Sequence, residues 1–167
     1  IALHQFAVGQ SNPTYMVSTG DQQYVLRKKP PGTLLPSAHA VDREYRIITA
    51  LSPTPVPVPK TYLLCEDENV LGTAFYVMDM VPGRVLDDQF APGFTPRERG
   101  AVYDNLLEIL ATFHSVDYEA IGLGNFGRPG NYYSRQINRW TKQYLASQTE
   151  TIPAMNHLMK WLPENVP

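Results

Sequence analysis

Two charged residues, Arg27 and Glu44, occupy positions where a charge is expected to need a partner. Arg27 lies in "QYVLRKKP", where alternate residues of a strand face the same way, so it shares a face with the apolar Val25. Glu44 stands three residues after Val41 and four before Ile48, on or beside the apolar stripe of a helix. Because an unpaired buried guanidinium is very costly, the two side chains are expected to form an ion pair. The alternative, and the more usual outcome for a single charge, is that each is solvated.

The stretch "GQSNP", residues 9–13, is the second candidate for chemistry. Gly, Asn and Pro are turn residues whatever the function, so a plain hairpin turn is one interpretation. The other is a phosphate-binding loop, because Gly9 permits close backbone approach and the Ser11 hydroxyl with neighbouring N–H groups could form an anion-binding concavity. A cation held beneath this turn by a carboxylate would suit a phosphate group.

The elements that must position these residues follow from turn signals and periodicity. Five stretches of β-type residues are predicted as strands: residues 2–8, 14–19, 23–28, 61–66 and 73–81. The first three are joined as hairpins, and "DENVLG" is expected to be the turn between the last two. Ser37 is expected to cap a helix that lies between the third and fourth strands and ends at "SPTPVPVPK".

After "VPG", near Pro82, the pattern changes to helix. Thr95, Pro96 and Glu98 form a capping box with proline at the first helical position, and apolar residues continue at helical spacing to about Ser115. Two more helices are predicted, one with apolar residues around Trp140 and one starting near Pro153. The lobe boundary is therefore predicted near Pro82.

Composition excludes several classes of function. The 167 residues are 43% hydrophobic, which suits a folded domain or two small lobes. A net charge of −2, from interspersed acidic and basic residues, does not favour nucleic acid or an anionic membrane surface as a partner. No apolar run is long enough to span a membrane. The single cysteine, Cys65, excludes an internal disulfide and favours a reducing compartment.

Three segments of the sequence, taken together, resemble those of a known family. "GQSNPTY", "YVLRKKPPGTLLPSAHAVDREY" and "TAFYVMDMVPGRV" resemble the aminoglycoside phosphotransferase and choline kinase-like superfamily. The sequence of these segments is most similar to the kinase-like region found N-terminal in acyl-CoA dehydrogenase family members 10 and 11. The resemblance implies an α+β, protein kinase-like fold, with a five-stranded antiparallel sheet and one helix in residues 1–81. Residues 82–167 would then be the first helices of a mainly helical second lobe.

The resemblance also implies roles for individual residues. Arg27 would reach the α/β-phosphates of ATP, Glu44 would hold Arg27, and Ser11 and Asn12 would touch the β/γ-phosphates. Arginine stands here where protein kinases use lysine, and its planar fork grips phosphate differently.

Between the lobes, "YVMDMVPG" is similar to a kinase hinge. Met78 would lie at the back of the adenine pocket, while the Asp79 carbonyl and the Val81 N–H would hydrogen-bond the base. A Met-flanked stretch is otherwise more often simple core.

The catalytic half of a kinase site has no match in the sequence. Such a site needs H-x-D-x-x-x-x-N and a metal-binding Asp. In "HSVDYEAIG" the Asn position falls on Gly122, so His114 is interpreted as a packed helix-end residue and Asp117 as a turn residue. The base and the Mg²⁺ ligands are expected beyond Pro167, and this chain alone is expected to be inactive.

The resemblance thus predicts an ATP- and Mg²⁺-dependent phosphotransferase that acts on a small-molecule hydroxyl. For the acyl-CoA dehydrogenase-linked members the acceptor would be a hydroxylated acyl-CoA such as a 4-hydroxyacyl-CoA, with a dehydrogenase domain on the same parent chain. Alternatives are an aminoglycoside or choline-type alcohol kinase, or a non-catalytic pseudokinase-like scaffold.

Two further expectations concern surroundings. The protein is expected to be intracellular, in mitochondria or peroxisomes if eukaryotic and otherwise in the cytoplasm. Arg135, Arg139 and Lys142 would form one basic face of a helix, which is usually solvated but could receive the phosphates of coenzyme A.

Overall fold

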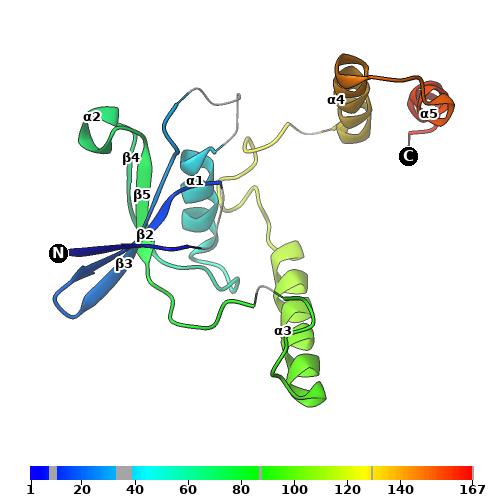
Figure 1. Cartoon of the computed structure of the whole chain (residues 1–167). Helices are drawn as coiled ribbons and strands as arrows, with labels where there is room; N and C mark the ends of the chain where they lie inside the picture. The colour runs from blue at the N-terminus through cyan, green and yellow to red at the C-terminus, as the bar shows by residue number, and fades with distance from the viewer. Residues whose placement is uncertain (8–10, 33–38, 87, 129, 167) are drawn as a thin grey trace. The chain divides into compact units, whose positions relative to one another are not determined.

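A computed structural model describes residues 1–7, 11–32, 39–86, 88–128 and 130–166. Gly9, Gln10 and Ser37, which carried parts of the loop and helix-cap predictions, lie outside the described residues. The chain divides into two compact units, Ile1–Leu123 and Gly124–Pro167, and each is described by itself (Figure 1). The boundary predicted at Pro82 falls inside the first unit and stays a prediction.

The first unit contains the predicted five-stranded antiparallel sheet, with strand order β1-β2-β3-β5-β4. The strands are β1 (Ala2–Gln5), β2 (Thr14–Thr19), β3 (Gln22–Lys28), β4 (Thr61–Cys65) and β5 (Phe75–Asp79). Each predicted strand is present, although β1 and β5 are shorter than expected. In the register of the sheet, Arg27 of β3 stands between Thr14 of β2 and Tyr76 of β5, so these three side chains share one face.

Helix α1 (Val41–Leu51) packs against this sheet and forms the core with it (Figure 1). Its first and last residues, Val41 and Leu51, are buried, as are Val25 and Tyr76 on the strands. Tyr45 of α1 meets the Tyr76 ring edge-on, with 6.0 Å between the ring centroids. Arg27 lies two residues after the buried Val25 on β3, so its charged side chain is on the face of the sheet that packs against α1.

The predicted start of α1 is wrong. The residue before its first turn is Ala40, whose side chain cannot cap a helix, and its carbonyl accepts the Glu44 N–H at 3.2 Å. Ser37 is three residues too early to cap a helix that begins at Val41. The apolar spacing identified the helix correctly, but a nearby serine was not sufficient to locate its end.

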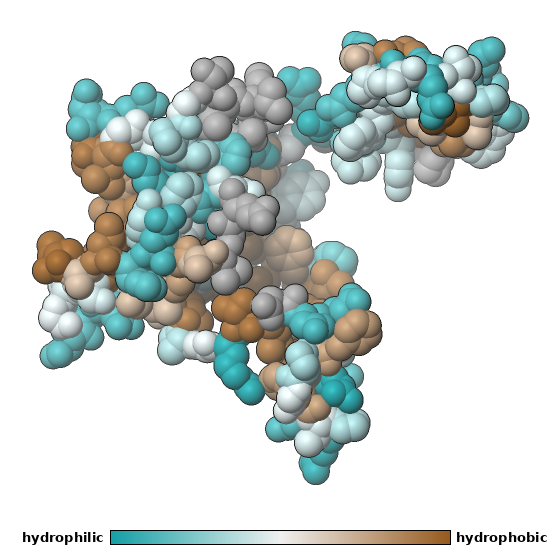
Figure 2. Space-filling view, viewed as in Figure 1, coloured by the Kyte–Doolittle hydropathy of each residue, from teal (hydrophilic) through white to brown (hydrophobic). Residues whose placement is uncertain are grey.

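The predicted turn between β4 and β5 contains a short helix, α2 (Glu68–Leu71). Asp67 caps it by accepting the Asn69 N–H at 2.9 Å, and Gly72 ends it with a φ of 81°. The turn residues in "DENVLG" are therefore the two caps of one helical turn. Val70 and Leu71 stay exposed, and hydrophobic surface is visible around α2 (Figure 2).

Helix α3 (Pro96–His114) has the predicted capping box. The Thr95 hydroxyl accepts the Glu98 N–H at 3.3 Å, and the Glu98 carboxylate accepts the Thr95 N–H at 2.8 Å. The Glu98 carboxylate also accepts the Thr95 hydroxyl at 2.8 Å. The bonds that this carboxylate accepts, first from the Thr95 N–H and then from the Thr95 hydroxyl, lower the pKa of Glu98 below its ordinary value, because both favour the charged form. The apolar residues predicted along this helix, Leu106, Leu110 and Phe113 among them, are exposed.

The second unit contains α4 (Tyr132–Ser147) and α5 (Pro153–Glu164), both as predicted. Their apolar sides face a common hollow of about 220 Å³. Ile137, Trp140 and Tyr144 line it from α4, and Met155 and Leu158 are among the residues that line it from α5. Among the described residues, no helix combines the length and apolar character that crossing a membrane would require.

Candidate functional site

Arg27 and Glu44 form the predicted ion pair. The Arg27 Nε donates to Glu44 Oε2 at 2.7 Å, and the Arg27 Nη2 donates more weakly to Glu44 Oε1 at 3.5 Å. Their side chains are 30% and 34% exposed, so the pair is partly shielded and still reachable from solvent. The alternative, in which each charge is solvated alone, is wrong. Strand β3 and the first turn of α1 place the two groups, because both belong to the packed faces of their elements.

Two neutral donors complete the surroundings of Glu44. The Asn12 Nδ2 donates to Oε1 at 2.9 Å, and the Tyr76 hydroxyl donates to Oε2 at 3.1 Å. With the two bonds from Arg27, each carboxylate oxygen accepts one bond from the guanidinium and one from a neutral group. Such a carboxylate is fixed in orientation, and it fixes the guanidinium in turn.

The Tyr76 hydroxyl is a reliable donor at neutral pH. Burial raises the pKa of Tyr76 far above the ordinary value of a phenol, and the negative charge of Glu44 raises it further. The phenol therefore keeps its proton and continues to donate to Glu44.

Arg27 keeps donors for a ligand. Its Nη1 donates to Thr14 Oγ1 at 3.2 Å, so three of its five N–H groups have partners among the described residues. One N–H on each terminal nitrogen remains, which is the pair of donors that a phosphate can accept. The Thr14 hydroxyl donates its own hydrogen to the Asn12 carbonyl at 3.0 Å, which ties this corner to the turn after β1.

The structure separates the two turn residues predicted to touch phosphate. Ser11 is exposed, and a residue that contacts a bound phosphate must be accessible in this way. Asn12 is only 4% exposed, and both ends of its amide are occupied, by Glu44 and by the Nδ1 of His39 at 2.9 Å. The Asn12 side chain thus acts on the site through Glu44, and its contact with phosphate stays a prediction.

The predicted adenine-binding residues lie at the end of β5. Met78 stands between Val25 and Thr61 in the sheet, and Val81 follows the strand with 63% of its surface exposed. The Asp79 carboxylate accepts the Tyr62 hydroxyl at 2.5 Å, and that bond is the first cause of a raised pKa at Tyr62. The position of Asp79 is thus fixed by a side chain of β4, while binding of a base by this segment stays a prediction.

Comparisons with known proteins decide which family this site belongs to. The model of the phosphotransferase enzyme family, APH, matches residues 2–167. The chain belongs to this family. It is 51% identical to acyl-CoA dehydrogenase family member 10 of Mus musculus, over 99% of this chain and 15% of that protein. It is also 51% identical to the probable acyl-CoA dehydrogenase IBR3 of Arabidopsis thaliana, over 98% of this chain and 21% of that protein.

A solved structure gives the same result for the fold. A protein of Ralstonia eutropha, provisionally named an aminoglycoside phosphotransferase, is 55% identical with a TM-score of 0.84. The match covers 99% of this chain and 48% of that chain, so this chain spans about half of its solved relative and about a fifth or less of its curated relatives. The predicted family and the predicted kinase-like α+β fold are both confirmed.

Within this family frame, three residues at the site escaped prediction from the sequence. Thr14 and Tyr76 are the cross-strand neighbours of Arg27, so the register of the sheet would have indicated them. The pairing of β3 with β5, which are far apart in the sequence, is what the pattern alone could not supply. His39 gave no periodic signal, because it precedes α1.

The string "HSVDYEAIG" begins at the last residue of α3 and continues into a turn. Asp117 accepts the N–H groups of Glu119 and Ala120, both at 3.0 Å, so it is a turn residue. His114 lies at the end of α3 but is exposed, which corrects the expectation that it is packed. Among the described residues, no group of three or more acidic, His or Cys side chains is arranged to hold a metal ion.

The basic face predicted on α4 is smaller than expected. Arg135 donates to the carbonyl of Arg128 at 2.7 Å and also to the carbonyl of Gly130, so it supports the loop before the helix. Arg139 and Lys142 are exposed. Of the three basic residues predicted on this helix, Arg139 and Lys142 remain candidates for binding an anion.

Proposed function

We propose that this chain holds the phosphates of ATP in a phosphotransferase that moves the γ-phosphoryl group to a substrate hydroxyl. The observation that supports this most strongly is the Arg27–Glu44 ion pair, in a chain of the phosphotransferase enzyme family. Arg27 would bind the α/β-phosphates and Glu44 would hold its guanidinium in place. Ser11, on the exposed side of the turn, would approach the β/γ-phosphates.

The residues present fit a phosphate group. Arg27 is charged at every physiological pH, and one N–H on each of its terminal nitrogens has no partner among the described residues. Because Glu44, Thr14 and the buried Tyr76 fix the guanidinium beforehand, little reorganisation is needed when the ligand binds. Positioning and charge stabilisation are the main contributions that a phosphotransferase makes to catalysis.

The base of ATP would lie against the end of β5. We propose that Met78 forms the back of the adenine pocket, with the Asp79 carbonyl and the Val81 N–H as its hydrogen-bonding groups. The bond from Tyr62 to the Asp79 carboxylate supports this assignment, because it keeps that side chain from moving when the backbone binds a ligand.

Mg²⁺ would accompany ATP, but the described residues do not fit a site for it, since they contain no cluster of three possible ligands. The metal ligands and the catalytic base would therefore come from outside the described residues. This part of the protein would contribute the residues that bind the nucleotide.

The acceptor we propose is a hydroxylated acyl-CoA such as a 4-hydroxyacyl-CoA. The support is that the curated relatives are named acyl-CoA dehydrogenases and are much longer than the match, which leaves room for a dehydrogenase part. The resemblance to a protein named for aminoglycosides favours a second candidate, a small polar alcohol. A pseudokinase-like scaffold is the third, because arginine replaces the lysine usual in protein kinases.

The test is ADP formation by the full-length protein with Mg·ATP and one acceptor at a time. A 4-hydroxyacyl-CoA, the same acyl-CoA without the hydroxyl, an aminoglycoside and choline form a matched set. We expect ADP and a phosphorylated product only with the hydroxyacyl-CoA. Turnover with the other alcohols would favour the second candidate, and nucleotide binding without turnover would favour the scaffold.

A further inference from the structure

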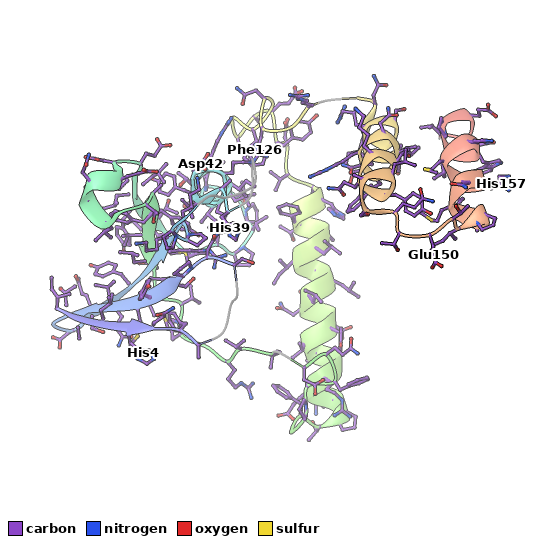
Figure 3. All side chains as sticks on the ribbon, turned by 45° about the horizontal axis from the view of Figure 1, so that its top comes forward. His4, His39, Asp42, Phe126, Glu150 and His157 are labelled. Atoms are coloured by element: carbon purple, nitrogen blue, oxygen red, sulfur yellow. The ribbon has the colours of Figure 1, made fainter. Side chains whose placement is uncertain are left out.

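Asn12 links the turn after β1 to the start of α1. Its amide bonds Glu44 in the first turn of that helix and His39 just before it, each at 2.9 Å. Since Asn12 is 4% exposed, water cannot readily replace either bond. Figure 3 places His39 and Asp42 at this same end of α1.

The bonds of Asn12 determine which atom of His39 carries hydrogen. The Glu44 carboxylate is paired with Arg27 and can only accept, so the Asn12 group that faces it is the NH₂. The Asn12 Oδ1 then faces His39 and can only accept. The His39 Nδ1 must therefore be a donor, which requires a hydrogen on that nitrogen.

The backbone of His39 is held in an uncommon conformation. Its φ is 57°, in the left-handed region, where histidine and asparagine are found more often than most residues. Its carbonyl accepts the Val41 N–H at 2.9 Å, at the residue where α1 begins. The side chain of His39 is thus directed by the same turn that starts the helix carrying Glu44.

We propose that His39 is a positioning residue for the nucleotide site: its Nδ1–H fixes the Asn12 amide, which orients Glu44 and, through it, Arg27. This role rests on the proposed function, because the group finally positioned is the phosphate-binding guanidinium. Without the Nδ1 donor, the Asn12 amide loses the partner that sets its orientation. Glu44 then loses one of its two neutral donors, and the Arg27 fork is held less firmly for its ligand.

Two substitutions separate the hydrogen bond from the backbone. His39→Asn keeps an N–H donor at the place of Nδ1 and tolerates a positive φ, whereas His39→Gly tolerates the φ and removes the donor. We expect H39G to weaken binding of Mg·ATP to the full-length protein by about 3- to 10-fold, the range for one hydrogen bond, and H39N to restore most of it. His157→Asn, on α5, is the matched control and should bind as the wild type does.

A double-mutant cycle tests whether the effect passes through Asn12. We expect N12A to weaken binding, and H39G to add little in the N12A background, because both changes break the same chain of contacts. Additive losses, or equal affinity of H39G and H39N for Mg·ATP in calorimetry, would overturn the role of His39.

The tautomer of His39 can be measured in the wild-type protein without nucleotide, so this test does not depend on whether a substituted protein folds. Spectra of ¹⁵N-histidine in the wild-type protein should show a hydrogen on Nδ1 of His39, and a neutral ring with hydrogen only on Nε2 would overturn the inference. If the wild type fails to bind Mg·ATP, the proposed function and the positioning role built on it are both wrong. The spectrum then decides the His39–Asn12 bond separately.

Discussion

The arginine at position 27 contacts two neighbouring elements at once through its planar guanidinium. Its Nε and Nη2 face Glu44 while Nη1 faces Thr14, so one planar group contacts two elements and keeps donors for a third partner. A lysine ammonium is a point charge on a flexible stem and cannot reproduce that fork. The guanidinium is therefore suited to a phosphate approaching in a defined direction.

The Glu44 carboxylate should matter to ligand binding through its charge. E44Q keeps the size of the side chain but presents an NH₂ group where Glu44 now accepts from Arg27 or from a neutral donor. We expect Mg·ATP to bind about 10-fold or more weakly to E44Q, the loss typical of a charge-assisted hydrogen bond. Calorimetry on the full-length protein measures it, with E108Q on exposed α3 as the control. Equal affinity of E44Q and wild type would contradict this.

Tyr76 gives a prediction about alkaline pH. Y76F should cost about 1 kcal/mol of stability near pH 7, because one hydrogen bond to Glu44 is lost. The pKa of Tyr76 is raised in the folded state, so this stability is fully present below the ordinary tyrosine pKa of about 10 and is lost as pH rises above it. Urea unfolding of both proteins between about pH 7 and pH 11 should show the difference shrinking above about pH 10. A constant difference would contradict the raised pKa.

At this scale the sequence predicted the charged pair but not its neutral neighbours. Arg27 and Glu44 stood out because charges on packed faces need partners, and that argument requires no coordinates. In the sequence, Tyr76 and Thr14 have the pattern of ordinary strand residues, because only the register of the sheet brings their hydroxyls to the site. Asn12 was predicted to contact phosphate, which stays a prediction, and the structure shows its buried amide bonded to Glu44 and His39.

Helix caps show at the scale of elements what local sequence can and cannot supply. The capping box of α3 was predicted in detail because both of its bonds lie within four residues. The start of α1 was predicted wrongly because that helix begins after Ala40, with no side-chain cap. α2 was taken for a turn because its two caps are turn residues on either side of a single helical turn.

The capping box of α3 can be tested by its pH dependence. T95A should destabilise the protein by about 1 kcal/mol, the usual cost of losing such a cap. The pKa of Glu98 is lowered in the folded state, so the stability it adds is present above the ordinary glutamate pKa of about 4.3 and is lost as pH falls below it. E98Q should therefore lose this acid-dependent component in thermal unfolding between about pH 3 and pH 7. An unchanged acid profile in E98Q would exclude the box as its source.

The exposed basic residues of α4 give a test of the acceptor. If Arg139 helps to bind the phosphates of coenzyme A, R139E should raise the KM for a hydroxyacyl-CoA severalfold and leave the KM for ATP unchanged. R135E is unsuitable for this purpose, because Arg135 supports the loop before the helix. An unchanged KM for the acyl-CoA in R139E would dismiss an acceptor role for this face.

At the scale of the whole molecule, this chain corresponds to part of its longer relatives. The match spans residues 2–167 of this chain and 48% of a solved relative. The described residues contain the Arg27–Glu44 ion pair, but no group of three or more acidic, His or Cys side chains arranged to hold a metal ion. We therefore expect turnover to need residues outside those described, and we propose that binding of the nucleotide phosphates depends on the Arg27–Glu44 pair.

The most direct test of the central claim is calorimetric titration of Mg·ATP into the full-length protein and its R27A variant. We expect the wild type to bind, R27A to bind about 10- to 100-fold more weakly, and R97A, on the exposed surface of α3, to bind like the wild type. Binding by R27A with wild-type affinity, or no binding by the wild type, would contradict the claim that Arg27 holds the nucleotide.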